Sequence, residues 1–275
     1  MNRLFVVVVL YRQRWQESPL LPVLEDFCKN GQGSLLVYDN SPTAQEDPFF
    51  LTEGVYYLHN DKNSGLATAY NKAIQLAGTT HDRLLLLDQD TLLSKAYLDE
   101  VICWNISEDV PVIVPRLFAG DRQVSPLMAA EYIGRNSLPL APGVYHERLM
   151  AVNSGCGISL AYLKETGGFN ESFPLDFLDH WFFFRLFTAG KGVRVSQKAM
   201  QHELSVLDYR NVTPQRYQSI LSGEYLFYTK YDSACSKRHQ KQLFLRMIKQ
   251  FITVKDRRIW KLTQQAYLKL RRSPD

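Results

Sequence analysis

Residues 84–91 read Leu-Leu-Leu-Leu-Asp-Gln-Asp-Thr, so four consecutive leucines end at two carboxylates, Asp88 and Asp90. Such an apolar run predicts a strand buried on both faces, and strands of this kind belong to parallel sheets covered by helices. Because burying charge is unfavourable, we expect the two acids to face a cleft, a cation or both. Hard divalent cations that also carry phosphate oxygens use one or two carboxylates in such a position. The alternative is a polar loop that caps the next helix, since Thr91 and Ser94 are also suitable N-caps.

Length and composition are those of an ordinary globular protein. With 275 residues, of which 45% are hydrophobic and 22% charged, the chain suits one large α/β domain or one domain with an appendage. The apolar run at 4–10 is too short for a membrane span and lacks a small-residue cleavage site, so we expect a first strand and no signal peptide. The cysteines form no CxxC pair, which fits buried thiols in a reducing cytoplasm better than disulfides or a zinc site. They are Cys28, Cys103, Cys156 and Cys235.

The net charge of +4 hides an asymmetry between the body of the chain and its end. Residues 237–275 contain twelve Lys/Arg and two acids, whereas the rest of the chain carries 20 Lys/Arg against 26 Asp/Glu. A mildly acidic body with a strongly basic tail indicates that the tail meets something anionic. We therefore expect a domain over 1–236 and a basic amphipathic helical tail over 237–275.

The first half of the chain alternates predicted strands and helices, which is the pattern of a doubly wound sheet. Ligands in such sheets bind beyond the carboxyl ends of the strands. Asp39, Asn63 and the Asp88/Asp90 pair all fall at such ends, so we expect them near one ligand site. The predicted strands cover 4–10, 34–38, 55–59, 83–87 and 112–114, and the predicted helices cover 17–29, 63–77 and 94–104.

The second half is less regular. Residues 116–148 contain three prolines and little periodicity, which indicates an excursion near the cleft. We expect a strand at 152–160, a helix at 177–188 and a strand at 193–195. In the tail, apolar residues recur on one helical face among basic ones. They are Leu243, Phe244, Met247, Ile248, Phe251 and Ile252.

Short motifs follow one another in a fixed order between residues 4 and 205. They are Val-Val-Leu-Tyr at 8–11, Tyr-Asp-Asn-Ser at 38–41, Asn-x-Gly-x-Ala-x-Ala-x-Asn at 63–71, Leu-Asp-Gln-Asp at 87–90, Asn-Ser-Gly at 153–155, Gly-Gly-Phe-Asn-Glu at 167–171 and Asp-Phe-Leu-Asp at 176–179, then Arg185 and His202. This series resembles the family 2 inverting glycosyltransferases, and its bacterial rhamnosyltransferase-like branch in particular. The resemblance implies a GT-A (Rossmann-like) α/β fold with a mixed, mostly parallel sheet flanked by helices. The basic tail lies outside it.

The resemblance implies a nucleotide-sugar site. Asp39 would accept a hydrogen bond from a uracil or thymine base, and the alternative for this residue is an Asx turn. Asn63, Gly65 and Asn71 would line the base and ribose, and the alternative for them is a helix N-cap with a surface Asn. Asp88 would bind ribose or the water shell of a metal. Tyr11 and Gln89 complete the implied nucleotide-sugar residues.

The resemblance also implies a Mg²⁺ or Mn²⁺ ion. Asp90 would hold the ion against the diphosphate, where a metal stabilises the charge that grows on the leaving group. His202, in Gln-His-Glu, matches the position where a histidine completes this site, although a lone histidine is more often structural. Ser154 and Gly155 would form the floor beneath the transferred sugar.

Asp179 is the candidate catalytic base, because it precedes Arg185 by the spacing of the family pattern. It would deprotonate an acceptor hydroxyl that attacks opposite the leaving group, which gives inversion. Asp176 could orient the acceptor or be the base itself, because Trp181 stands where the family often has a second acid. The alternatives are that both acids cap the helix, that Trp181 belongs to the core and that Arg185 is a structural ion-pair partner.

The implied reaction transfers a sugar, most simply rhamnose from dTDP-rhamnose, to a glycan or polyprenyl-diphosphate-linked acceptor in bacterial surface polysaccharide synthesis. UDP-glucose or UDP-galactose is the alternative donor. The implied location is the cytoplasm, peripheral to the inner face of the bacterial cytoplasmic membrane, with the tail in contact with the lipid surface.

Other functions remain open at this stage. The chain could be a non-catalytic sugar-nucleotide-binding subunit, or the tail could be a tethering module or a helix packed on the body or on a second subunit. No recognised motif supports nucleic-acid binding, and no GxGxxG follows the first strand as in a Rossmann dehydrogenase. The sequence does not determine the oligomeric state.

Overall fold

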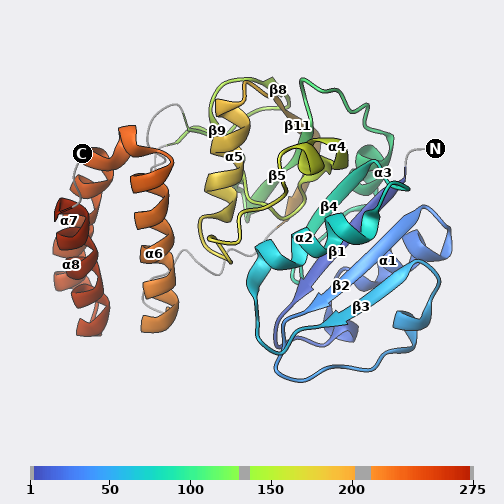
Figure 1. Cartoon of the computed structure of the whole chain (residues 1–275), viewed down its shortest axis with the longest axis horizontal. Helices are drawn as coiled ribbons and strands as arrows, with labels where there is room; N and C mark the ends of the chain where they lie inside the picture. The colour runs from blue at the N-terminus through green and yellow to red at the C-terminus, as the bar shows by residue number, and fades with distance from the viewer. Residues whose placement is uncertain (1–2, 130–136, 202–211, 273–275) are drawn as a thin grey trace.

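The computed structural model describes residues 3–129, 137–201 and 212–272 (Figure 1). Its centre is a mixed, mostly parallel sheet in the order β3-β2-β1-β4-β10-β5-β11-β8, with β6 paired to β5. Helices cover both faces of this sheet, so the predicted α/β fold class is confirmed. The strands of the first half are β1 (Leu4–Leu10), β2 (Gly33–Asp39), β3 (Val55–His59) and β4 (Arg83–Asp88), all parallel to their neighbours among these four.

The first strand shows why the sheet needs two layers of helices. Every residue of β1 is buried, and successive side chains point to opposite faces. Phe5, Val7 and Val9 pack against α2 (Gly65–Ala77), whereas the alternate residues pack against α1 (Leu21–Lys29) and α3 (Lys95–Cys103). The predicted helix at 17–29 begins only at Leu21, after a short 3-10 turn at Trp15–Glu17.

An antiparallel strand interrupts the parallel sheet beside the carboxylates. β10 (Gly157–Ser159) lies between β4 and β5 (Val112–Ala119) and is antiparallel to both. It is shorter than the predicted strand at 152–160, because Asn153–Cys156 form a turn in which the Cys156 amide donates to the Asn153 carbonyl at 2.9 Å. This turn lies next to the end of β4.

The described part of the region 116–148, expected to be an excursion, and the residues just after it contain short strands. They are β6 (Arg122–Ser125), β7 (Leu127–Met128), β8 (Gly143–Tyr145) and β9 (Leu149–Met150), of which β7 and β9 form a separate two-stranded sheet. After β10 come α4 (Leu160–Glu165), α5 (Leu178–Thr188) and β11 (Val193–Gln201). The predicted helix at 177–188 is confirmed, and the strand predicted at 193–195 continues to Gln201.

The chain ends in three helices, α6 (Pro214–Lys230), α7 (Ser236–Thr253) and α8 (Arg257–Arg272), which lie together at the left of Figure 1. α6 joins two cores. Its Phe227 and Tyr228 belong to the core of the sheet domain. Its Tyr217 and Leu221 share a second, small core with apolar residues of α7 and α8. The predicted division of the chain at residue 236 remains a prediction. We call α6, α7 and α8 the helical unit, and α6 joins this unit to the sheet domain.

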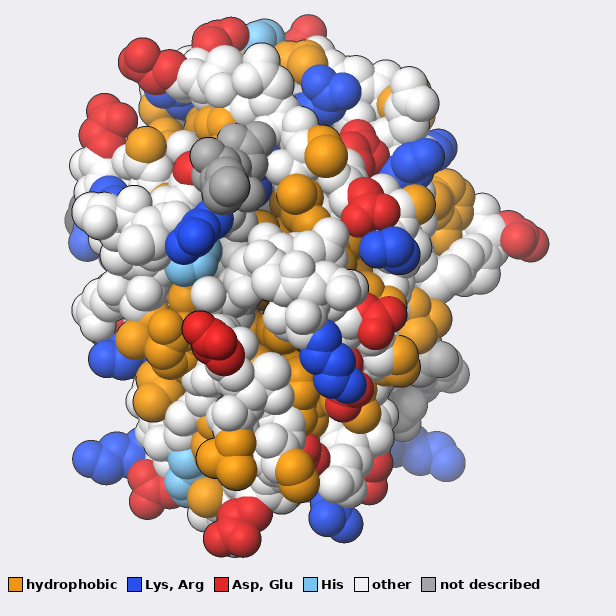
Figure 2. All heavy atoms as spheres, turned by 90° about the vertical axis from the view of Figure 1, so that its right-hand side faces the viewer, with side chains coloured by type: hydrophobic (Ala, Val, Ile, Leu, Met, Phe, Trp, Pro, Cys, Tyr) orange, Lys and Arg blue, Asp and Glu red, His pale blue; other side chains and the backbone are white. Residues whose placement is uncertain are grey.

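Two surface features complete the description. Figure 2 shows the face opposite the three helices, where acidic and basic side chains are interspersed. Within the residues that the structure describes, we find no helix whose length and apolar character would let it span a bilayer.

Candidate functional site

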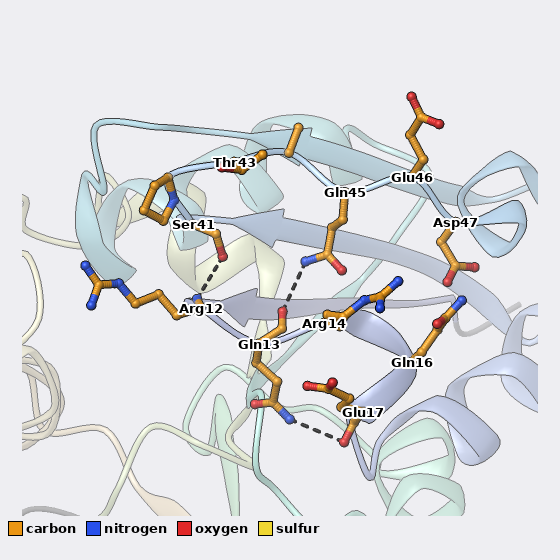
Figure 3. A pocket seen from close by; sticks show the side chains of 12 residues that line it. Arg12, Gln13, Arg14, Gln16, Glu17, Ser41, Thr43, Gln45, Glu46 and Asp47 are labelled. Atoms are coloured by element: carbon orange, nitrogen blue, oxygen red, sulfur yellow. Dashed lines mark hydrogen bonds between the residues drawn. The ribbon is translucent and has the colours of Figure 1, made fainter.

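The carboxyl ends of β1 and β2 open into a hollow of about 770 Å³ (Figure 3). Polar and charged side chains line it, and they come from the loop that follows β1 and the loop that follows β2. The two loops are tied together, because Arg12 N–H donates to Ser41 Oγ at 2.8 Å and Gln45 Nε2 donates to the Gln13 carbonyl at 3.1 Å. This is the strand edge at which the sequence predicts a ligand.

Asp39 ends β2 and is fully buried beneath this hollow. Its carboxylate accepts from Ser41 N–H at 2.9 Å, the Asx-turn bond that was the alternative prediction for this residue. It also accepts from Gln45 Nε2 at 2.9 Å and from the Tyr57 hydroxyl at 2.8 Å. Burial by itself raises the pKa of Asp39, but the hydrogen bonds from Ser41, Gln45 and Tyr57 together lower it. A nucleobase N–H could bind here by replacing one of the two side-chain donors.

Two of the predicted nucleotide-sugar residues meet directly. Tyr11 N–H donates to Gln89 Oε1 at 2.6 Å, so the loop after β1 is tied to the loop after β4. Ser18 Oγ donates to the Gln89 carbonyl at 2.9 Å, which adds a second tie. The Tyr11 ring itself is exposed.

Two carboxylates stand at the end of β4, and the charge of a third acts on the first of them. Asp88 is its last residue, Asp90 follows in an exposed turn, and Asp179 lies in the first turn of α5. Burial, together with the negative charges of Asp90 and Asp179, raises the pKa of Asp88 to about 7. The negative charge of Asp179 therefore acts on Asp88. A cation would neutralise this concentration of charge.

The floor of the acidic site is built from buried hydroxyls and glycine. Ser154 accepts from Asp88 N–H at 3.0 Å, and its hydroxyl lies 2.5 Å from Thr91 Oγ1. Gly155 adopts a φ of +86°, and a Cβ there would lie 2.6 Å from the Pro115 side chain. Thr91 therefore supports the site and caps no helix, whereas Ser94 does cap α3 by accepting from Tyr97 N–H at 3.2 Å.

The motif at 63–71 binds another part of the chain in this structure. A Cβ on Gly65 would lie 2.2 Å from the Pro174 carbonyl oxygen. Asn71 exchanges hydrogen bonds with the backbone of Phe169. Asn63 is exposed with a φ of 48°. That Asn63, Gly65 and Asn71 line a nucleotide stays a prediction, and the structure adds that Gly65 and Asn71 hold the segment preceding Asp176.

Asp176 and Asp179 lie in different environments. Asp176 is nearly buried and pairs with Arg216 of α6 at 2.9 Å. Burial raises the pKa of Asp176 although the Arg216 charge opposes the shift. Between the two acids, Phe177 adopts a φ of +65°, an unfavourable backbone conformation for an aromatic residue. No side chain caps α5 at its N-cap, Phe177, but Asp179 lies in the first turn of α5 and accepts from the His180 backbone N–H at 2.8 Å, so the helix-start alternative stays open for Asp179.

Asp179 is more accessible, with 26% of its side chain exposed, and its partner is His180. The His180 ring nitrogen Nδ1 lies 3.0 Å from Asp179 Oδ1, and the ring stacks on Phe177 at 4.3 Å between centroids. Sequence reasoning did not single out His180, because an adjacent residue in a helix gives no periodic signal. The Asp-His pair is nevertheless readable in the sequence at 179–180.

The remaining candidates on α5 have structural contacts. Trp181 is buried in the core, which confirms the alternative prediction that it is a core residue. The guanidinium carbon of Arg185 lies 5.2 Å from the centroid of the Trp181 ring, and Arg185 Nη2 donates to the Thr166 carbonyl at 2.5 Å. An orienting role for either residue toward an acceptor stays a prediction.

Asp88 and Asp90 have the chemistry to bind a divalent ion, because both are carboxylates and the negative charges of Asp90 and Asp179 act on Asp88. Over the residues that the structure describes, no group of three or more His, Cys, Asp or Glu is arranged to hold a metal by itself. Mg²⁺ commonly uses only one or two carboxylates together with phosphate oxygens. The predicted ligand His202 lies outside the described residues. Gln201 forms an antiparallel bridge with Leu92, two residues after Asp90.

The fold is similar to that of solved glycosyltransferases with the GT-A fold. The crystal structure of GalNAc-T7 with UDP, GalNAc and Mn²⁺ matches with a TM-score of 0.57 and 12% identity, over 88% of this chain and 51% of that one. S. aureus TarS 1–349 matches with a TM-score of 0.50 and 14% identity, over 98% and 88% of the two chains. The chain thus spans about half the length of GalNAc-T7. At these identities the likeness shows the fold. No family model matches the chain, and neither does any curated protein.

Proposed function

We propose that this chain is a metal-dependent inverting glycosyltransferase that moves rhamnose from dTDP-rhamnose to a glycan or lipid-linked oligosaccharide in bacterial surface polysaccharide synthesis. The observation that carries the proposal is the placement of Asp88 and Asp90 at the carboxyl end of β4, where burial and the charges of Asp90 and Asp179 raise the pKa of Asp88 to about 7. Such a concentration of acids at a strand end of an α/β sheet is unfavourable unless it binds a cation or moves a proton. Transfer from a nucleotide diphosphate-sugar to a hydroxyl moves a proton, and a cation can stabilise the leaving diphosphate.

The donor would bind across the carboxyl ends of β1, β2 and β4. Asp39 is the candidate acceptor for a thymine or uracil N–H, and the hollow beside it can take the base or ribose. The tie between Tyr11 and Gln89 would hold the loops on either side of the diphosphate. The alternative donor is a UDP-hexose, and GalNAc-T7, whose structure contains UDP, supports it at the level of the fold.

Asp88 and Asp90 would hold Mg²⁺ or Mn²⁺. When bound, the ion supplies a Lewis acid that stabilises charge on the leaving diphosphate. Ser154 and Thr91 fix the backbone of Asp88 from below, so the carboxylate is held at the end of its strand. His202, which matches the metal-site position in the resemblance, stays a proposed ligand.

Asp179 would take the proton from the acceptor hydroxyl. Its partial exposure makes it reachable, and His180 fixes one of its oxygens through a hydrogen bond. The acceptor oxygen would attack the sugar on the side opposite the diphosphate, so the C–O bond to the acceptor forms as the bond to phosphate breaks and the configuration inverts. Asp176 is a weaker candidate for the base, because its ion pair with Arg216 occupies it.

The test is nucleotide release by the purified chain against dTDP-, UDP- and GDP-sugars, with a polyprenyl-diphosphate-sugar acceptor and either Mn²⁺ or EDTA. We expect metal-dependent release from one donor. Turnover should fall about 10²- to 10⁴-fold in Asp179→Asn with nucleotide affinity retained, and the metal-dependent release should be lost in Asp90→Ala. Asp26→Asn, on an exposed position of α1, is the matched control for removing one carboxylate.

The outcomes separate the alternatives. Release from a UDP-sugar alone replaces rhamnose transfer by hexose transfer. Nucleotide binding without any turnover, unaffected by Asp179→Asn, indicates the non-catalytic binding subunit. Absence of both turnover and nucleotide binding refutes the glycosyltransferase proposal.

A further inference from the structure

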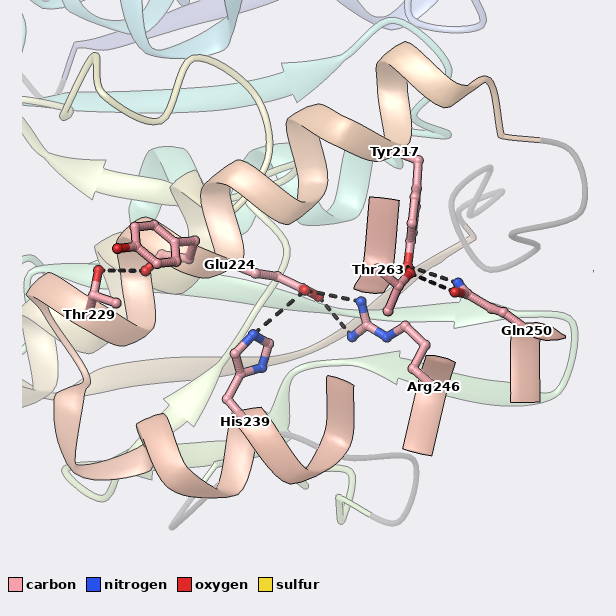
Figure 4. Close-up of polar contacts among 8 residues, drawn as sticks. Tyr217, Glu224, Thr229, His239, Arg246, Gln250 and Thr263 are labelled. Carbon is pink, nitrogen blue, oxygen red and sulfur yellow. Dashed lines mark hydrogen bonds and ion pairs between the residues drawn. The ribbon is translucent and has the colours of Figure 1, made fainter. Parts of the chain in front are cut away.

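The helix α7 packs against the rest of the molecule through its polar side. Arg246 donates two hydrogen bonds to Glu224 of α6, at 3.0 and 2.9 Å, and both side chains are largely buried (Figure 4). Gln250 donates to the Tyr217 hydroxyl at 2.8 Å and accepts from Thr263 Oγ1 at 2.6 Å. These contacts fix which side of α7 faces inward.

The side of α7 that faces outward is apolar. With 3.6 residues per turn, the large apolar residues of the stripe fall roughly opposite Arg246 and Gln250. They are exposed to between 42% and 77%, and we call them the α7 outer stripe: Phe244, Leu245, Ile248, Phe251 and Ile252. Of the stripe predicted from the sequence, Leu243 alone is buried in the helical core. An amphipathic helix normally turns its apolar side inward, so this arrangement is reversed.

Basic side chains surround the α7 outer stripe. α7 and α8 together contain eleven Lys/Arg and no Asp or Glu. Lys241 lies within the stripe by helical position, and Lys249 flanks it. This charge contrasts with the opposite face of the molecule, where both signs are mixed (Figure 2). The surface therefore combines exposed apolar area with a strong positive field.

We propose that the α7 outer stripe binds the surface of a bilayer containing anionic lipids, with the helix lying parallel to the membrane plane. The apolar side chains would enter the boundary between headgroups and acyl chains, and the lysine ammonium groups would reach the lipid phosphates above them. Charge disfavours a second copy as the occupant, because two such faces would repel each other. A nucleic acid would meet the charge and leave the apolar stripe exposed to water.

Trp260 provides a spectroscopic reporter for this contact. Its ring lies 5.5 Å from that of Phe251 and is partly exposed, whereas the other three tryptophans are buried. Insertion of the stripe should shift the Trp260 emission to shorter wavelength. The inference does not depend on sugar transfer, because the contact would form whatever the acidic site does.

The test is co-sedimentation of the full chain with vesicles of phosphatidylcholine alone and with vesicles containing an equal part of phosphatidylglycerol. We expect binding to the anionic vesicles with a blue shift that disappears in Trp260→Phe. The double variant Ile248→Ser/Ile252→Ser should bind at least tenfold more weakly. The pair Lys241→Gln/Lys249→Gln should bind about tenfold more weakly at low salt. Leu51→Ser, which changes an exposed leucine outside the helical unit, is the matched control and should bind normally.

Three results would overturn the proposal. The first is no binding to anionic vesicles by a folded wild-type chain. The second is equal binding by wild type and Ile248→Ser/Ile252→Ser, which would reduce the contact to charge alone. The third is a dimer in sedimentation equilibrium that the same double variant converts to a monomer, which would assign the stripe to a second copy.

Discussion

Asn71 and Phe169 exchange two hydrogen bonds across the molecule. Phe169 N–H donates to Asn71 Oδ1 at 2.8 Å, and Asn71 Nδ2 donates to the Phe169 carbonyl at 2.9 Å. Asn71 Nδ2 also lies 3.2 Å from Glu171 Oε1. Through these bonds α2 fixes the chain segment that leads to Asp176 and Asp179.

Asn71→Ala should therefore lower the free energy of unfolding by about 2 kcal/mol, because both backbone groups of Phe169 lose their partner. Asn71→Asp keeps the acceptor for Phe169 N–H but places a carboxylate oxygen against the Phe169 carbonyl and Glu171, so it should be at least as destabilising. Urea denaturation of both variants checks this. Unchanged stability together with lost nucleotide affinity would instead assign Asn71 to the ligand, as the family resemblance implies.

Base recognition by Asp39 can be separated from its role in the loop. Asp39→Asn should weaken dTDP and UDP binding strongly, because the amide presents one acceptor in place of a carboxylate. Tyr57→Phe removes one hydrogen bond to the same carboxylate and should cost about 1 kcal/mol of stability with little change in affinity. Calorimetric titration with dTDP, UDP and GDP measures the affinities, and urea denaturation measures the stability. Equal losses of affinity in the two variants would indicate that Asp39 only shapes the loop.

His180 should position Asp179. His180→Leu removes the side-chain hydrogen bond to Asp179 Oδ1, leaves the bond from the backbone N–H of residue 180 in place, and should lower kcat about tenfold with KM nearly unchanged. His180→Gln keeps a donor and should recover most of kcat. Steady-state kinetics on the donor found in the release assay decides between them. If Gln is as impaired as Leu, the ring stack on Phe177 matters and the hydrogen bond does not.

The helical unit should be sensitive to acid. Burial lowers the pKa of His239 to about 4, although the Glu224 charge raises it, and Arg246 lowers it further. The His239 ring also stacks on Tyr228 at 4.1 Å. Between pH 6.5 and about 4 the unfolded chain binds a proton that the folded chain does not, so stability falls as the pH falls through this window. The full effect is on the order of 3 kcal/mol.

Urea unfolding at neutral pH and near pH 5 measures this dependence. His239→Gln removes the titrating group, so its stability should change less between the two conditions. An identical acid-induced loss in wild type and His239→Gln would show that other groups are responsible.

The sequence correctly predicted those helices and strands whose residues interact with near neighbours in the chain or with a uniformly apolar core. The strand at 55–59 has the predicted bounds, and the leucine run forms β4 as expected. What the sequence did not predict depends on distant partners. Nothing local indicates that β10 would enter the sheet antiparallel, or that Arg216 would pair with Asp176. The apolar stripe of α7 was predicted, but its direction depends on buried polar contacts that no periodicity reports.

The same limit applies to the candidate site. Asp39 and Asp88 could be predicted as site residues from the local sequence, because each is a charged residue at the end of an apolar strand. The approach of Asp179 to Asp88 depends on how α5 packs, and the loop-holding contacts of Gly65 and Asn71 depend on the segment at 169–174. The order of the motifs along the chain suggested that these residues belong to one site, but it did not show which contacts bring them together.

Because α6 contributes to two cores, the chain has no clean cutting point before α7. Ending it at residue 236 would strip the cover from Tyr217 and leave the Glu224 carboxylate buried without the Arg246 guanidinium. An uncompensated buried charge is strongly destabilising. The loss would spread along α6 to Arg216 and hence to Asp176. If a truncated chain failed to transfer sugar, the cause would therefore be a destabilised fold. Point substitutions on the outer surface of α7 avoid this problem, so they can separate the role of α7 from that of the acidic site.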